Sequence, residues 1–217
     1  FLFSALLFLM SAALLLAVRQ APLTPSPAVS ALIFGLPVLL CFFLSRSPLR
    51  FTLGLGAVLL AGSFYEGEKG RVLHTARSFF GVHRVTADPA NNSHLLIHGK
   101  TLHGRQNRPP ALAREPLTYY HRTGPIGQIL ATYGRDPRTA IGAVGLGAGS
   151  LATYAQPAQP WTYFEIDPVV EQLARDPRYF TFLRDSPAAL RVVLGDARLT
   201  LAAAPEGAFG ILVLDAF

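Results

Sequence analysis

The sequence is poor in cysteine and in charge. Cys41 is the single cysteine among 217 residues, and charged side chains make up only 15% of the chain. One cysteine excludes an intrachain disulfide framework and any metal site built from several cysteines. Residues 1–64 contain no acidic side chain, so the net charge of +6 is spread over this stretch and the rest of the chain. Without a dense basic patch, nucleic acid is not an expected partner.

Hydrophobic residues make up 51% of the chain. Before residue 66 they form three apolar runs, at 1–18, 28–44 and 51–65. A helix needs about 20 mostly apolar residues to cross about 30 Å of hydrocarbon. The runs therefore predict about three transmembrane helices over residues 1–65, of which the third is short and rich in glycine. A buried core helix and a cleaved signal peptide are the competing interpretations.

Basic residues near the ends of these runs predict an orientation. Five of these basic residues would lie on the same side of the membrane as the C-terminal part, and two on the other side. Because basic residues are more frequent on the cytoplasmic side, the C-terminal part is expected to be cytoplasmic. We therefore expect a multi-pass protein of the inner or plasma membrane, in contact with the lipid bilayer. Because the chain begins inside an apolar run, we expect it to be the tail of a larger polytopic protein.

Residues 66–110 predict a small β-rich segment. Two β-prone runs, at 79–86 and 94–101, flank a stretch at 88–92 with the composition of a turn. Five of the six histidines lie before Gln106. They lack the convergent spacing of a ligand set, so a metal site is not expected.

Residues 111–217 predict a doubly wound sheet of the Rossmann type. A short apolar strand at 139–144 is followed by Gly145-Leu146-Gly147-Ala148-Gly149-Ser150 and a short helix. Glycines at such a junction let the backbone approach a ligand and leave amides free to donate. We therefore expect Gly145, Gly147 and Gly149 to contact a cofactor. Ser150 replaces the third glycine of the dinucleotide pattern, which favours an S-adenosyl compound over NAD.

Three later strands are predicted to end at acidic residues. Glu165 lies near the end of an apolar run at 161–166. Asp196 follows the run at 190–194, and Asp215 follows the run at 209–214. Ligands of open α/β sheets bind at the carboxyl ends of the strands. Glu165 stands near the offset from the glycine turn at which a carboxylate accepts ribose hydroxyls. Helix N-capping is the more ordinary role for Asp167, and is the alternative role for Asp196.

The order of these motifs resembles that of the spermidine synthase family. The matching segments are 144–150, 163–167, 195–197 and 212–215, together with 98–106 and Tyr120-His121, which resemble the family's N-terminal β segment and substrate-side motif. Over residues 70–217 the chain is similar to membrane-fused bacterial spermidine synthase-like proteins. The resemblance implies an α/β fold in which a small β domain precedes a methyltransferase-like Rossmann sheet. That sheet would be incomplete, because the chain stops just after Asp215.

The resemblance also implies an activity. The family moves an aminopropyl group from decarboxylated S-adenosylmethionine to putrescine or a related amine, and no metal is involved. Glu165 would hold the ribose, Asp196 and Ala197 the adenine edge, and the glycine turn the thioether side. Gln106, Tyr120 and His121 would lie on the side of the aminopropyl group and the amine. A homo-oligomer is compatible with this assignment.

Asp215 is the expected base. A primary amine with a pKa near 10.4, as in lysine, is protonated at neutral pH and cannot attack carbon. A carboxylate at the end of a strand can bind the ammonium group and accept its proton. A cap or a cofactor contact is the alternative role for Asp215.

Two alternative functions remain open. Ala148 stands where the family usually has an aspartate, and Arg122 where it usually has a glutamate. The donor could therefore be S-adenosylmethionine itself, and the protein a methyltransferase. The second alternative is a non-catalytic membrane transporter or sensor with a domain that binds an adenosyl or polyamine ligand.

Overall fold

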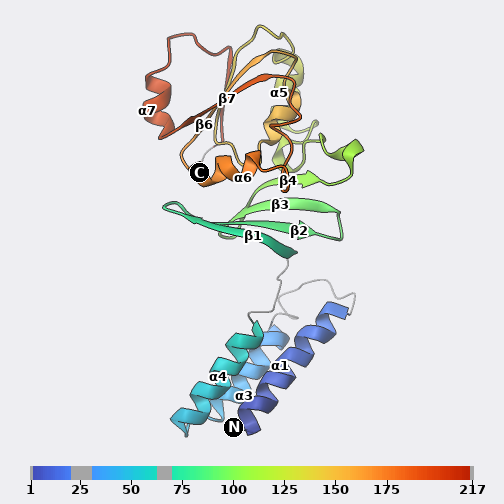
Figure 1. The fold of residues 1–217 in the computed structure, drawn as a ribbon, viewed down its shortest axis with the longest axis vertical. Helices are drawn as coiled ribbons and strands as arrows, with labels where there is room; N and C mark the ends of the chain where they lie inside the picture. The colour runs from blue at the N-terminus through green and yellow to red at the C-terminus, as the bar shows by residue number, and fades with distance from the viewer. Residues whose placement is uncertain (1, 21–30, 63–69, 216–217) are drawn as a thin grey trace. The chain divides into compact units, whose positions relative to one another are not determined.

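The computed structural model describes residues 2–20, 31–62 and 70–215 (Figure 1). The chain divides into two compact units, Phe1–Glu68 and Lys69–Phe217. The first is helical, and the second contains two β-sheets. Each unit is described by itself.

The helical unit contains α1 (Leu2–Gln20), a π-helical turn η1 (Ala31–Gly35), α3 (Leu36–Phe42) and α4 (Pro48–Gly62). A close approach between these helices occurs at Gly54 of α4. A Cβ atom at this position would lie 2.8 Å from Cys41 Sγ and 3.2 Å from Leu7 Cδ1. The glycine therefore lets both buried side chains pack directly against the α4 backbone.

The expectation of transmembrane helices is wrong. Within the described ranges, no helix is both long enough and apolar enough to cross a bilayer. The second apolar run is divided between η1 and the seven-residue α3, with Pro37 in the first turn of α3. The 15 residues of α4 extend about 22 Å at 1.5 Å per residue, short of about 30 Å of hydrocarbon. The apolar part of α1 ends at Val18, before Arg19 and Gln20. The multi-pass membrane localisation was inferred from these runs, and it is wrong for the same reason.

The second unit begins with an antiparallel sheet of four strands in chain order. They are β1 (Arg71–Ser78), β2 (Gly81–Asp88), β3 (Ser93–His98) and β4 (Thr101–Asn107). The sequence predicted two of these strands, and the second predicted run at 94–101 in fact includes the turn between β3 and β4. The register shifts between Leu96 and Ile97, which leaves His103 as an extra residue in β4. Such a bulge redirects a side chain.

The parallel sheet has the order β7-β6-β5-β8. Its strands are β5 (Ile141–Val144), β6 (Pro160–Glu165), β7 (Ala189–Leu194) and β8 (Ile211–Leu214). The chain runs from β5 outward to β7 and then returns to place β8 beside β5, so a topological switch point lies between β5 and β8. Ligands of open α/β sheets bind at such a point.

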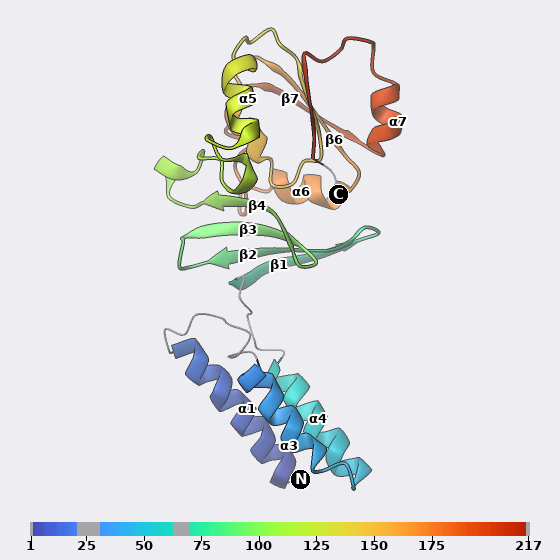
Figure 2. The same ribbon diagram turned by 180° about the vertical axis from the view of Figure 1, so that it is seen from behind.

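Helices flank the parallel sheet. They are α5 (Pro125–Tyr133), α6 (Pro168–Arg175) and α7 (Ala197–Ala202), with 3-10 turns η2 (Pro110–Leu112), η3 (Thr118–Tyr120) and η4 (Ser150–Tyr154). Figures 1 and 2 show α5 and α7 on opposite sides of this sheet. The predicted helix after the glycine turn is only the 3-10 turn η4, whereas the helix that Asp167 was expected to cap is confirmed as α6.

The two sheets pack against each other through polar contacts as well as a shared core. Val85 and Leu96 of the antiparallel sheet belong to the same buried cluster as Ile141, Trp161 and Tyr163 of the parallel sheet. His94 of β3 is buried, and its Nδ1 atom lies 3.0 Å from the carbonyl oxygen of Tyr179. The antiparallel sheet is thereby held against the parallel sheet through the shared core, and against the segment that follows α6 through His94.

Candidate functional site

A pocket of about 240 Å³ lies between the antiparallel sheet and the carboxyl ends of the parallel strands. Its lining comes from both sheets, so neither sheet forms it alone. The lining residues are Phe80, His83, Leu96, His98, His103, Tyr119, Gly145, Leu146, Gly147, Glu165, Ile166, Asp167, Val170 and Asp215. Of the residues expected from the sequence to form a site, the pocket brings together Gly145, Gly147, Glu165 and Asp215.

The glycine turn forms the floor of the pocket between β5 and η4. Gly147 has a φ angle of +53°, and a Cβ atom there would lie 2.4 Å from the carbonyl oxygen of His103. Both the backbone conformation and the close approach require glycine. The bulged residue His103 of β4 therefore fixes where the turn can lie.

Glu165 ends β6 and holds the glycine turn through its side chain. Its Oε2 accepts a hydrogen bond from the Leu146 amide at 2.9 Å, and its Oε1 accepts one from the Asp167 amide at 2.9 Å. The side chain is buried yet lines the pocket. Each carboxylate oxygen can accept a second hydrogen bond, so Glu165 can also receive hydroxyl groups from a ligand.

Asp215 follows β8 and faces two tyrosines from η3. Tyr119 donates to Asp215 Oδ2 at 3.4 Å, and Tyr120 donates to the same oxygen. Burial raises the pKa of Asp215, while the Tyr119 hydrogen bond lowers it. Burial, together with the charge of Asp215, raises the pKa of Tyr119 to about 12. The Tyr119 phenol therefore remains a donor to this half-buried carboxylate at neutral pH.

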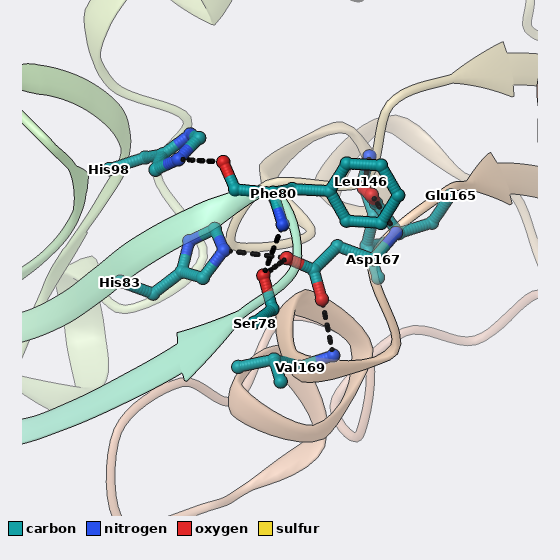
Figure 3. A network of polar contacts seen from close by, with 8 residues as sticks. All are labelled: Ser78, Phe80, His83, His98, Leu146, Glu165, Asp167 and Val169. Carbon is teal, nitrogen blue, oxygen red and sulfur yellow. Dashed lines mark hydrogen bonds and ion pairs between the residues drawn. The ribbon is translucent and has the colours of Figure 1, made fainter.

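Asp167 connects the two sheets, as Figure 3 shows. Its Oδ1 accepts the Val169 amide at 2.9 Å, which confirms the predicted N-cap of α6. Its Oδ2 accepts from Ser78 Oγ at 2.5 Å and lies 2.7 Å from His83 Nε2. Burial alone would raise the pKa of Asp167, but these hydrogen bonds hold the pKa below its usual value.

Three histidines cross the antiparallel sheet on the face toward the pocket. The His83 and His98 rings stack with centroids 4.5 Å apart, and the His98 and His103 centroids are 5.5 Å apart. Burial lowers the pKa of His103, and the neighbouring His98 and His83 rings lower it further. No group of three or more potential ligands with a geometry suited to a metal ion occurs among the described residues.

Other residues named from the sequence lie outside the pocket lining. Gln106 is buried, donates to Ala113 O and Thr181 Oγ1, and accepts from the Thr181 amide. Asp196 caps α7 through the Arg198 amide, which confirms that alternative. Its ion pair with Arg198, at 2.5 Å, lowers the pKa of Asp196 to about 2.

The remaining residues that the sequence predicted for the site, and that do not line the pocket, are Tyr120, His121, Gly149 and Ala197. Tyr120 is buried and contacts the site through its hydroxyl group on Asp215. His121 is exposed, with Nδ1 2.9 Å from Thr123 Oγ1. Gly149 adopts a left-handed conformation as the N-cap of η4, and Ala197 begins α7.

Sequence reasoning missed Tyr119 and His83 as pocket residues. Tyr119 is adjacent to Tyr120, but which of the two tyrosines lines the pocket depends on η3. His83 is 84 residues from Asp167 in the sequence. The one available signal was that alternate residues of β2 point to the same face of the sheet.

Comparison with known proteins first defines a class of fold. No protein-family model matches the chain. No curated protein matches it either. Among solved structures, the chain is similar to a probable spermidine synthase from Corynebacterium glutamicum ATCC 13032, with a TM-score of 0.51 and 19% sequence identity. The match covers 66% of this chain and 52% of the other. The class is therefore an antiparallel β-sheet followed by a methyltransferase-like parallel sheet.

More particularly, the fold is spermidine synthase-like. Two further structures are similar at a TM-score of 0.45 and 13% identity. One is a spermidine synthase from Thermotoga maritima, which covers 67% of this chain, and the other is a spermidine synthase in complex with the transition state analogue AdoDATO, which covers 68%. The match covers 47% of each of these two chains. The chain thus spans about half the length of the solved structures that it matches.

Proposed function

We propose that the protein containing this chain is an aminopropyltransferase of the spermidine synthase type. It moves an aminopropyl group from decarboxylated S-adenosylmethionine to putrescine or a related amine. Residues 70–215 supply the adenosyl-binding turn and the proton acceptor of this reaction.

The observation that carries the proposal is the environment of Asp215. This carboxylate stands at the switch point between β5 and β8, lines the same pocket as Gly145 and Glu165, and accepts hydrogen bonds from two tyrosines. A strand end with a base, a glycine turn and a second carboxylate, all at a switch point of the sheet, suits transfer from an adenosyl donor.

The acid–base chemistry supports this role. The acceptor amine is protonated at neutral pH, so it must lose a proton before its nitrogen can attack the methylene carbon beside the sulfonium. The new C–N bond then forms as the C–S bond breaks, and methylthioadenosine leaves as the neutral thioether. Burial raises the pKa of Asp215, which brings it closer to that of the amine and makes its carboxylate a stronger base.

Glu165 would bind the other end of the donor. Its two oxygens already accept the Leu146 amide of the glycine turn and the Asp167 amide before α6, which fixes the carboxylate beside Gly145. The remaining lone pairs suit the two hydroxyls of a ribose.

Methyl transfer from S-adenosylmethionine is the second candidate. The observation that favours it is the environment of Ala148, which is buried, with its Cβ atom next to Gly104 of β4. The glycine turn therefore presents no carboxylate at this position to an aminopropyl ammonium group.

A product analysis tests both candidates. The protein is incubated with putrescine and either decarboxylated S-adenosylmethionine or S-adenosylmethionine, and the sulfur product is identified by mass spectrometry. Methylthioadenosine together with spermidine supports aminopropyl transfer. S-adenosylhomocysteine would instead support methyl transfer. Binding of an adenosyl ligand without either product would indicate a protein that binds the ligand but catalyses neither transfer.

The Asp215→Asn variant tests the base. We expect turnover to fall by about 10²- to 10⁴-fold, the usual contribution of a general base, while adenosyl binding is kept. Asp136→Asn is the matched control, because Asp136 is an exposed aspartate paired with Arg138 away from the pocket. Equal activity of both variants would remove Asp215 from the mechanism.

A further inference from the structure

A second pocket, of about 390 Å³, lies beside α5. Residues of α5 and of η4 contribute to its lining, together with Arg122 before α5 and Arg135 after it. Among the described residues, none lines both this pocket and the pocket of Asp215. The volume lies within the range of about 300–1,000 Å³ that is typical of small-molecule sites.

The two pockets carry opposite charges. Three carboxylates line the pocket of Asp215, those of Glu165, Asp167 and Asp215 itself, and no described arginine or lysine does. The pocket beside α5 is lined by the guanidinium groups of Arg122 and Arg135, and by no acidic side chain of the described ranges. Because opposite charges attract, the first pocket suits a cation and the second an anion.

Arg122 is held in place by contacts that leave most of its donors available. Its Nε donates to both carboxylate oxygens of Glu115, at 3.0 and 3.1 Å. Its guanidinium carbon lies 5.7 Å from the centre of the Tyr154 ring, which also lines the pocket. A guanidinium group has five N–H donors, and Nε supplies only one of them. The other four, on the two Nη atoms, can bind an oxyanion while the Glu115 pair stays intact.

Arg135 supplies the second positive charge. It is exposed and forms no ion pair within the described part of the chain, where the adjacent Asp136 pairs with Arg138 instead. Glu115 lies outside the lining and offsets only one of the two guanidinium charges. A net positive charge therefore remains at the pocket.

The donors favour a phosphate group over a carboxylate. A phosphate monoester has three acceptor oxygens and a charge of about −1.5 to −2 at neutral pH, whereas a carboxylate has two oxygens and one charge. Arginine forms two parallel hydrogen bonds with such oxygens. Gln156 adds a neutral donor, because its Nε2 gives one hydrogen to the Tyr154 carbonyl oxygen and keeps a second. Leu130 and Ala131 also line the pocket and can contact the organic part of the ligand.

We propose that the pocket beside α5 binds a small phosphate-bearing molecule through Arg122 and Arg135. Neither the donor nor the acceptor of the proposed aminopropyl transfer carries a phosphate group, so this ligand is not a substrate of that reaction. The inference goes beyond the proposed function and does not rest on it.

The test measures binding in a buffer without phosphate. Inorganic phosphate, glucose 6-phosphate, glucuronate and glucose are titrated calorimetrically into the protein. Glucuronate carries a carboxylate in place of the phosphate, and glucose carries no charge. Arg122→Gln and Arg135→Gln each remove one guanidinium group. Arg138→Gln is the matched control, because Arg138 is an exposed arginine close to Arg135 in the sequence but lies outside the lining.

We expect glucose 6-phosphate to bind about 10-fold or more tightly than glucuronate, and glucose to bind more weakly than either. Arg122→Gln and Arg135→Gln should each weaken the binding of both phosphate probes by about 10-fold or more, the usual loss when a hydrogen bond between charged groups is removed. Arg138→Gln removes the same charge and should change the affinity by less than about twofold, since it removes no contact with the ligand.

Three results would overturn the inference. Absence of binding by both phosphate probes would remove the site. Wild-type affinity in either pocket variant, or an equal loss in Arg138→Gln, would show that the two arginines do not form it. Equal affinities for glucuronate and glucose 6-phosphate would overturn the assignment to phosphate. None of these measurements involves turnover, so each leaves the proposed aminopropyl transfer as it stands.

Discussion

Tyr120 donates its phenolic hydroxyl to Asp215, and so joins η3 to the end of β8. The two residues are 95 positions apart in the sequence. Tyr120 is buried, so its hydroxyl group is fixed in place, whereas the adjacent Tyr119 lines the pocket. The proposed base is therefore oriented from one side by a residue that belongs to the core.

Removal of the Tyr120 hydroxyl should shift the pH dependence of turnover. Asp215 accepts a proton only when ionised, so activity falls as the pH drops through its pKa. In Tyr120→Phe the carboxylate loses a donor that favours its charged form, and the acid limb of kcat/KM should move to higher pH. Tyr119→Phe is the comparison, and it should move the acid limb in the same direction, because the Tyr119 hydrogen bond lowers the pKa of Asp215. Identical profiles for wild type and Tyr120→Phe would contradict this role.

Asp215→Asn should keep or increase thermal stability at pH 7 even as it removes activity. The pKa of Asp215 is raised in the folded protein, so its contribution to stability is full below the unfolded value near 3.9 and is lost as the pH rises through the folded value. At neutral pH the ionised carboxylate therefore opposes folding, and asparagine removes this charge. Thermal unfolding followed by circular dichroism measures the effect. A clear loss of stability at pH 7 would show that burial of the charge is compensated.

Asp167 should make the second unit sensitive to acid. Its folded-state pKa is lowered, so its contribution to stability is present above the unfolded value near 3.9 and is lost as the pH falls through the lower folded value. Asp167→Asn keeps an N-cap side chain for α6 but removes the charge. We expect the variant to be less stable than wild type at pH 7, by about 1–3 kcal/mol for hydrogen bonds to a buried charged group. The difference should shrink below pH 4 in thermal unfolding measured across this range.

Gly147→Ala should disturb the glycine turn by more than backbone strain alone. The added Cβ would meet His103 O at 2.4 Å, in a residue with a φ angle of +53°. Gly207→Ala is the matched control, because Gly207 has a φ angle of +70° but nothing within 4 Å of an added Cβ. We expect about 1 kcal/mol of destabilisation for the control and about 2–4 kcal/mol for Gly147→Ala, together with weaker adenosine binding. Equal effects in chemical denaturation would mean that the turn can move away from β4.

Local patterns in the sequence were sufficient for the parallel strands and for the caps of two helices in the second unit, but they did not reveal β1 as a strand or separate β3 from β4. The four parallel strands, the left-handed glycines after β5 and the caps of α6 and α7 all follow from neighbours within a few residues. A residue such as Asp167 before Pro168 is recognisable as a cap because the hydrogen bond that it makes is local. The same local reasoning was wrong for the apolar runs before residue 66, because hydrophobicity alone did not reveal where each helix would stop.

The site itself was decided by contacts between distant parts of the chain. Strand order placed β8 beside β5, and this put Asp215 next to the glycine turn and within reach of Tyr119 and Tyr120. Packing of the antiparallel sheet against the strand ends brought His83 to Asp167 and covered its second nitrogen. The sequence by itself determined which residues could act as caps, turns and strand ends, because those properties depend on adjacent residues. Only the tertiary structure decided which of them share a pocket, because pairing across 84 or 95 residues depends on the packing of whole sheets.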